Sequence, residues 1–126
     1  MAPCPGDEGF GPGGGFGVRR PLRFLAHKLD LDEKQVMLLA RILDELKTER
    51  AQAAVDDRRT LAEFADAVSS DRFDSAKAAA AGQRRVESNQ RLRTTLVRSL
   101  EQIHAMLNSD QRARLARLIR AGILVV

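Results

Sequence analysis

The side chains that most often carry chemistry are few and scattered in this sequence. The 126 residues include two histidines, His27 and His104, and one cysteine, Cys4. A zinc or copper site needs three or four histidine, cysteine, methionine or carboxylate groups that converge on one point. His27 stands alone on its predicted helix, and His104 has Met106 close by. We therefore expect no metal site; His27 and His104 are the candidates if two subunits share one.

The same shortage argues against catalysis. The glycines among residues 1–18 neither follow a strand nor match a phosphate-binding loop. Carboxylates are numerous, but their spacing places them on helix faces as solvated charges or as pairs one helical turn apart. No nucleophile, base and orienting group stand together. We expect a protein that is not an enzyme and uses no cofactor.

Lysine and arginine form the most regular chemical pattern in the chain. Four of them recur every seven residues and so share one stripe of a helix, namely Lys77, Arg84, Arg91 and Arg98. This stripe is either a solvated back face or a basic surface for acidic protein segments or lipid headgroups. Nucleic acid is not favoured, because no helix-turn-helix spacing and no set of base-stacking aromatic residues accompanies the stripe. The candidate binding residues are Arg50, Leu61, Phe64, Arg84, Arg85, Arg91, Arg93 and Arg98.

Charge divides the chain into an acidic and a basic part, although the formal net charge is only +4. Residues 21–71 hold 8 Lys/Arg and 11 Asp/Glu, a net −3. Residues 72–120 hold 11 Lys/Arg and 4 Asp/Glu, a net +7. An acidic helix packed beside a basic one explains this division. The alternative is a positive surface that attracts an acidic or unstructured partner.

The elements that must position these residues are helical. Apolar residues recur at helical spacing, and alternating strand patterns are absent from the sequence. We predict an all-α fold with helices over residues 21–30, 32–69, 74–106 and 109–121, in which the second and third form a long antiparallel hairpin flanked by two short helices. Residues 1–18 are predicted to be a flexible Gly/Pro-rich tail, and residues 19–126 a single helical domain.

Both long helices combine apolar ends with polar centres. In the third helix the predicted buried stripe includes Val86, Leu96, Val97 and Leu100. A closed monomeric bundle would need apolar residues along the whole stripe. We therefore expect a shallow layer of helices whose apolar patches are partly covered by a second subunit.

One helix-start signal occurs twice. The two copies read Leu31-Asp32-Glu33-Lys34-Gln35 and Leu107-Asn108-Ser109-Asp110-Gln111. In each copy, the Asp or Asn side chain is predicted to accept a hydrogen bond from a backbone N–H of the first helical turn. The Gln three residues later reaches back to the cap. Either Asp71 or Asp74 is predicted to cap the long helix between the two copies.

The doubled segment resembles the Leu-Thr-x-x-Gln signature of the Spy/CpxP family of bacterial envelope stress proteins. Asp32 and Asn108 replace the Thr, and both keep the capping chemistry. The corner over residues 70–74 is similar to the family as well. The resemblance implies a cradle-like homodimer without ATP or cofactor. It further implies binding of unfolded or aggregation-prone proteins on a shallow surface of apolar and basic character.

Two other interpretations stay open. The family includes the metal-linked proteins ZraP and CnrX, so the resemblance also allows a metal- or envelope-stress-responsive regulator with a sensor protein as its partner. In the metal-sensing branch a Met follows a His by four residues, whereas Asn108 occupies that place after His104. The third interpretation is a structural helical dimer that docks a membrane or another protein through residues 123–126.

The resemblance implies a periplasmic location. The sequence contains no run of about 18 apolar residues that would span a membrane. Residues 1–5 have neither the basic nor the apolar region of a signal peptide. One cysteine allows no intrachain disulfide and assigns no redox compartment.

Overall fold

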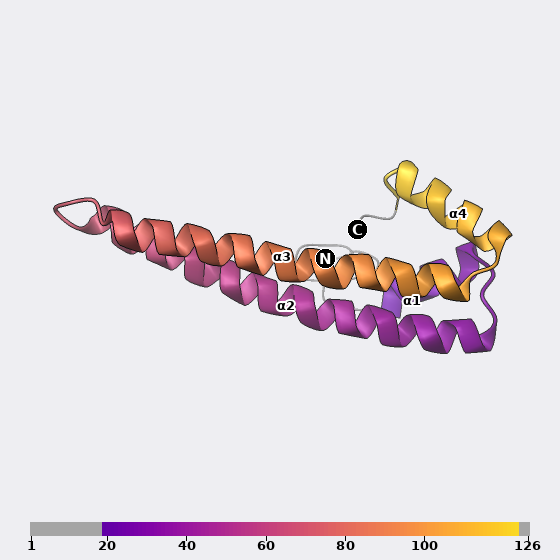
Figure 1. Cartoon of the computed structure of the whole chain (residues 1–126). Helices are drawn as coiled ribbons and strands as arrows, with labels where there is room; N and C mark the ends of the chain where they lie inside the picture. Colours follow the sequence, from indigo (N-terminus) through magenta and orange to yellow (C-terminus); the bar gives the residue numbers. More distant parts are fainter. Residues whose placement is uncertain (1–18, 124–126) are drawn as a thin grey trace, which may run out of the picture. The chain divides into compact units, whose positions relative to one another are not determined.

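The computed structural model describes residues 19–123, which form four α-helices (Figure 1). They are α1 (Arg19–Lys28), α2 (Glu33–Ser69), α3 (Ser75–Met106) and α4 (Ser109–Arg120). The predicted all-α fold, with a long antiparallel α2–α3 hairpin flanked by two short helices, is confirmed. Of these four described helices, none combines the length and the apolar character that crossing a membrane requires. The tail predicted for residues 1–18 lies outside the described residues, as do residues 124–126.

The helices begin and end at residues whose chemistry suits those positions. Between α1 and α2, Asp30 has a φ of 52°. Asp tolerates this left-handed conformation better than most residues because its short side chain bonds locally. At the start of α3, the Asp74 carboxylate accepts from the Lys77 backbone N–H at 3.0 Å. Of the two caps considered for this helix, the structure therefore selects Asp74 over Asp71.

The described residues divide into two compact units, and each long helix contributes to both. Unit 1 contains α1, α4, the part of α2 up to Thr48 and the part of α3 from Leu96. Unit 2 is Glu49–Thr95, which is the remainder of α2 and α3 with the turn between them. The single domain predicted over residues 19–126 stays a prediction.

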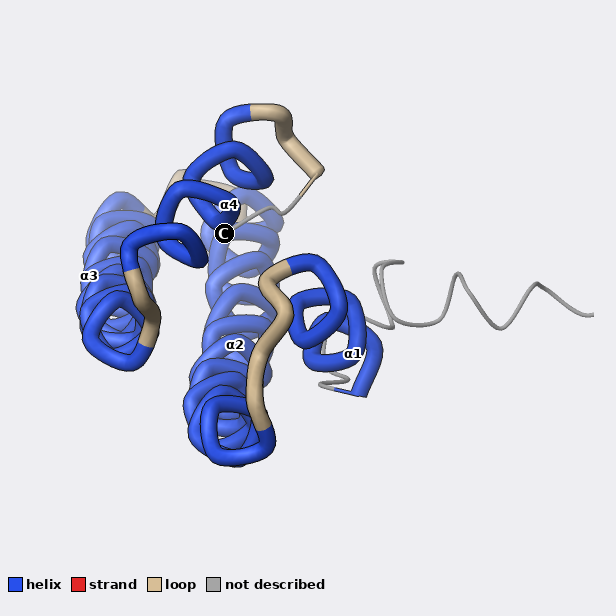
Figure 2. Tube along the Cα trace, turned by 90° about the vertical axis from the view of Figure 1, so that its right-hand side faces the viewer, coloured by secondary structure: helices blue, strands red, loops and turns tan. Residues whose placement is uncertain are grey.

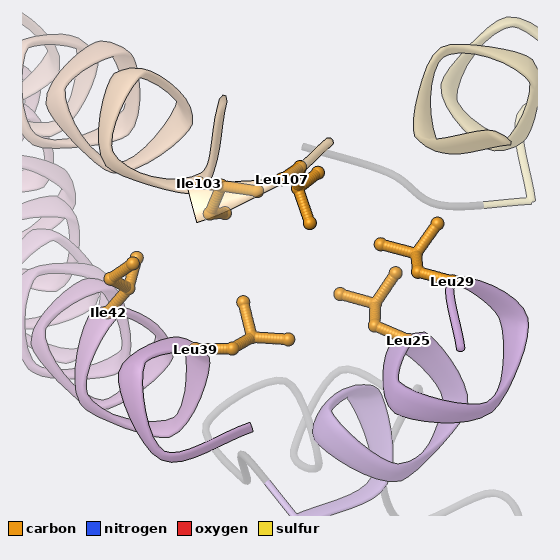
Figure 3. Close-up of a cluster of buried hydrophobic side chains, with 6 residues drawn as sticks. All are labelled: Leu25, Leu29, Leu39, Ile42, Ile103 and Leu107. Carbon is orange, nitrogen blue, oxygen red and sulfur yellow. The ribbon is translucent and has the colours of Figure 1, made fainter. Parts of the chain in front are cut away.

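Unit 1 has a hydrophobic core to which all four helices contribute. Six buried side chains meet there (Figure 3), and they are Leu25, Leu29, Leu39, Ile42, Ile103 and Leu107. Partly buried residues of α1 and α4 pack against this cluster, among them Leu22, Phe24, Leu115 and Leu118. The two short helices lie on the same side of the α2–α3 pair (Figure 2), so they close a core that two helices alone would leave open. Burial of each Leu or Ile stabilises the fold by about 2 kcal/mol.

Unit 2, which the structure describes throughout, has no comparable core. Its buried residues are small or polar, and they are Asp56, Thr60, Ala67, Ala81, Ser88 and Thr95. They recur every four or seven residues along α2 and α3, which is the spacing of a two-helix seam. Small side chains remove little apolar area from water when they are buried. Packing therefore stabilises unit 2 less than unit 1.

The predicted buried stripe of α3 is wrong at Val86 and Val97, which are 48% and 59% exposed. Ser88, Thr95 and Ser99 are buried instead. The two valines stand three helical turns apart, so they share one face of α3 just as core residues would. Apolar periodicity alone cannot distinguish such an outward face from the seam.

Candidate functional site

Both Leu-x-x-x-Gln segments form reciprocal caps at helix starts. At α2, the Asp32 carboxylate accepts from the Gln35 backbone N–H at 2.8 Å, and the Gln35 side-chain oxygen accepts from the Asp32 N–H at 3.0 Å. At α4, Asn108 and Gln111 make the same two hydrogen bonds, at 2.9 and 3.0 Å. Each pair satisfies two backbone N–H groups at the helix start.

The two glutamines also bind each other. The Gln35 amide donates to the Gln111 side-chain oxygen at 2.9 Å, and the Gln111 amide donates to the Gln35 oxygen at 3.1 Å. Gln35 further donates to the Met106 carbonyl at 2.8 Å. Gln111 further donates to the Leu29 and Asp30 carbonyls, at 3.2 and 3.3 Å. Each capping segment therefore holds the turn that precedes the other, and together they fasten the α1–α2 turn to the α3–α4 turn.

This amide pair lies at the edge of the unit 1 core. Gln111 is 6% exposed and Leu107 is 3% exposed, while Leu31 is half-buried. A buried amide that loses its hydrogen-bond partners costs about 1–3 kcal/mol. The doubled segment thus acts on the fold of unit 1, and its chemistry is that of a structural fastener.

The seam of unit 2 contains a buried carboxylate, Asp56, which the sequence patterns did not single out. It accepts from the side chains of Gln52 and Ser88, each at 3.1 Å. Arg91 approaches it at 2.9 Å and forms an ion pair. These interactions hold the pKa of Asp56 below its ordinary value, with the hydrogen bond from Gln52 as the largest cause, while burial opposes them. The sequence signal for this site is Ser88 and Arg91, which stand three residues apart on one face of α3. Which carboxylate they bind depends on how α3 packs against α2, and local sequence patterns do not determine that packing.

The cation row predicted on α3 pairs with carboxylates of α2. All four members make ion pairs, which are Lys77–Asp66, Arg84–Glu63, Arg91–Asp56 and Arg98–Glu45. The row therefore flanks the contact between the two helices and is not a free back face. An acidic helix packed beside a basic one, the first explanation of the charge division, describes this arrangement. Exposed ion pairs contribute about 0–1 kcal/mol each, so the row aligns the helices more than it stabilises them.

Large apolar side chains of unit 2 face solvent. On α2, Leu61 and Val68 are 54% and 69% exposed, and Phe64 is half-buried. These three residues stand at i, i+3 and i+7, so they form one stripe, which we term the apolar stripe. The Arg85 guanidinium lies 5.6 Å from the centroid of the Phe64 ring and pairs with Asp57 at 2.9 Å. Of the candidate binding residues, the structure thus brings Leu61, Phe64 and Arg85 together.

The other candidate binding residues have different surroundings. Arg84 and Arg91 are held by their carboxylates in unit 2, and Arg98 belongs to unit 1. Arg50 is half-buried and Arg93 is exposed, and neither forms an ion pair with any residue of the described range. Arg50 and Arg93 are therefore the members of the set with free charge.

The two histidines do not gather a ligand set. His27 on α1 and His104 on α3 are both exposed, and the His104 carbonyl accepts from Arg112 Nε at 3.0 Å. Within residues 19–123, no three His, Cys, Asp or Glu residues are grouped so that they could hold a metal ion. Cys4 lies outside the described residues. The metal- or stress-responsive regulator stays a prediction.

The fold and the doubled cap define a class: an all-α protein in which two capping glutamines fasten the ends of a long helical hairpin. A model of the LTXXQ motif family matches residues 18–119. The chain therefore belongs to the LTXXQ motif family, which is the Spy/CpxP/ZraP family, and the predicted resemblance is confirmed. The family comprises non-enzymatic chaperone and stress proteins that typically work in the periplasm. Searches among curated proteins and among solved structures find no match.

Proposed function

We propose that this chain is an ATP-independent chaperone that binds unfolded or aggregation-prone proteins on the apolar stripe and the cations around it. A periplasmic location, as is typical of the family, and the absence of enzymatic activity are parts of this proposal. Family membership supports the class of function. One observation on unit 2 carries the proposal for this chain.

That observation is that unit 2 exposes its large apolar side chains and buries small or polar ones. The large apolar residues that it exposes are Val55, Leu61, Val68, Phe73 and Val86, while its seam buries Ala, Ser, Thr and Asp. Each Å² of apolar surface left in water forgoes about 25 cal/mol of stabilisation. Exposed apolar side chains that share one helix face, as Leu61 and Val68 do, therefore indicate a binding site. An unfolded client offers apolar side chains that this surface can bury.

The cations give the same surface a second kind of contact. Arg85 lies over Phe64 at the edge of the stripe, and Arg50 and Arg93 are without a carboxylate partner among the described residues. Arginine contacts apolar surface with its stem and carboxylates with its head. Shallow contacts of this mixed kind suit many clients because they depend on no single client geometry.

The test is suppression of aggregation of a chemically unfolded test protein by the full chain. We expect suppression at substoichiometric amounts, unchanged by ATP. The double variant Leu61→Ser/Val68→Ser should lose most of it. The matched control Met37→Ser/Val97→Ser replaces residues of unit 1 that are 68% and 59% exposed. This control should still suppress aggregation as the wild type does. Failure of the wild type even in excess contradicts the proposal, as does equal loss in both double variants.

We further propose that the chain forms a homodimer. A second copy would cover part of the apolar surface that unit 2 exposes, and closed two-fold association is the commonest way in which identical chains do so. Sedimentation equilibrium of the full chain measures its mass directly. A monomer mass at the concentrations of the aggregation assay would contradict the dimer and leave the client-binding proposal standing.

A further inference from the structure

The positive charge of the chain is concentrated in the two short helices. α1 holds four Lys/Arg and no acidic residue, and α4 holds four Arg and one Asp, which together give +7. Unit 2 holds nine Lys/Arg and eight Asp/Glu, a net +1. Because the whole chain has a formal net charge of +4, everything outside α1 and α4 sums to −3. The net positive charge of the chain therefore lies mainly in the two short helices rather than in the two long ones.

Four of these cations are exposed and free of ion pairs within the described part of the chain. They are Arg23 and Lys28 on α1 and Arg117 and Arg120 on α4. Lys28 lies 5.8 Å from the centroid of the Phe24 ring. The cation row of α3, in contrast, is held by carboxylates of α2. Carboxylates of α2 thus neutralise the cation row of α3, whereas Arg23, Lys28, Arg117 and Arg120 have no carboxylate partner within residues 19–123.

The two short helices that carry these four cations pack on one apolar cluster in unit 1. α1 and α4 pack against the same apolar cluster through Leu25, Leu115 and neighbouring residues, and both lie on the same side of the α2–α3 pair (Figure 2). Since the apolar residues of each short helix face that cluster, its exposed cations occupy the outward faces. We term these outward faces the short-helix surface.

We propose that the short-helix surface docks on an anionic membrane. Three of the four exposed cations without an ion pair are arginines, namely Arg23, Arg117 and Arg120, and their planar heads bind phosphate oxygens in pairs. Ile123, 59% exposed, follows Arg120 by three residues. An apolar side chain beside cations suits the headgroup boundary of a bilayer, where each finds its own environment. An acidic protein segment would use the cations but leave Ile123 without a role, and nucleic acid binding would call for stacking aromatic residues on this surface.

The test is co-flotation of the full chain with lipid vesicles. One set contains equal parts of phosphatidylcholine and phosphatidylglycerol, and the other contains phosphatidylcholine alone. We expect binding to the anionic set at low salt and loss of binding at about 1 M salt, where the Debye length falls to about 3 Å. The quadruple variant Arg23→Gln/Lys28→Gln/Arg117→Gln/Arg120→Gln should bind at least about tenfold more weakly, because each cation near an anionic surface contributes several-fold.

A charge-matched control separates location from net charge. The variant Arg58→Gln/Arg59→Gln/Arg72→Gln/Lys77→Gln removes the same number of positive charges from exposed sites of unit 2. It should bind within about twofold of the wild type. Equal weakening by both quadruple variants would overturn the proposal, and so would equal binding to neutral vesicles. Circular dichroism of both variants checks that the helices remain folded.

Immobilised polyglutamate and duplex DNA serve as competing anions without a bilayer. Binding to either one through the short-helix surface, with no binding to anionic vesicles, would overturn the membrane proposal in favour of an acidic protein or a nucleic acid. Ile123→Gln sharpens this comparison. It should weaken vesicle binding and leave polyglutamate binding unchanged, because only the bilayer offers apolar surroundings.

Discussion

Units 1 and 2 are built from the same two long helices, yet they are held together differently. Unit 1 buries six large apolar side chains and joins its turns through the Gln35–Gln111 amide pair. Unit 2 buries small or polar residues and lines its seam with ion pairs. Large apolar burial dominates folding energetics, whereas exposed ion pairs contribute little. Unit 1 is therefore the anchor of the chain, and unit 2 is free to expose apolar surface.

This difference explains how one chain can be folded and still present apolar surface. A protein that buried Leu61 and Val68 in its seam would gain stability from their burial and would lack the apolar stripe. In unit 2 the seam residues are small, so the larger apolar side chains remain outside. Unit 1 thus supplies most of the apolar burial, and unit 2 exposes the apolar stripe.

The largest effect should come from the core of unit 1. Leu39 is fully buried, so Leu39→Ala should lower the free energy of unfolding by about 2–5 kcal/mol through lost burial and a cavity. Leu61→Ala makes the same chemical change on the exposed apolar stripe. It should change the free energy of unfolding by no more than about 0.5 kcal/mol. Urea denaturation followed by circular dichroism measures both. Similar losses in the two variants would contradict the division into an anchor and an exposed unit.

The next effect concerns the amide pair. Gln111→Glu places an acceptor-only carboxylate against the Leu29 and Asp30 carbonyls, to which Gln111 now donates. We expect a loss of about 1–3 kcal/mol. Gln83→Glu, at an exposed position of α3, is the matched control and should have little effect. If both variants unfold at the same urea concentration, the amide pair does not fasten the turns.

Acid should act on the seam of unit 2 through Asp56. Its pKa is lower in the folded chain than the unfolded value of about 3.9. The ionised carboxylate therefore stabilises the fold fully above that value, and this contribution is lost as pH falls from about 3.9 through the lower folded pKa. Asp56→Asn lacks the contribution. The gap in urea midpoint between wild type and Asp56→Asn should accordingly narrow over that range of pH.

A control carboxylate tests whether this acid effect belongs to the seam. Asp71 lies exposed in the α2–α3 turn, and Asp71→Asn should leave the urea midpoint near that of the wild type at neutral pH. A gap between wild type and Asp56→Asn that stays constant down to the lowest pH measured would show that Asp56 gains nothing from being ionised.

The smallest effect should come from an exposed ion pair. Lys77 and Asp66 approach to 3.8 Å with both side chains well exposed. Lys77→Gln should therefore lower the free energy of unfolding by no more than about 1 kcal/mol, and by less at high salt. Arg91→Gln should have a larger effect, because it leaves the buried Asp56 carboxylate without its cation. Thermal unfolding of the two variants side by side measures the difference, and a larger loss in Lys77→Gln would contradict this ranking.

The sequence by itself determined the elements of this protein and their ends. Periodic apolar residues and the absence of breakers predict long helices, and the capping segments at residues 31–35 and 107–111 mark where two of them begin. These signals are local, because a cap or a helical turn involves residues within four positions of each other. They also carry the resemblance to the LTXXQ family.

Only the tertiary structure decided which faces of those helices meet. Val86 and Ser88 are two residues apart, and no local rule says that the serine is buried while the valine is exposed. Likewise, no local rule says that Arg84 forms an ion pair with Glu63 of α2 while Arg93 forms none within the described residues. The physical reason is that burial and charge neutralisation depend on the partner helix, whose contacts lie dozens of residues away along the chain.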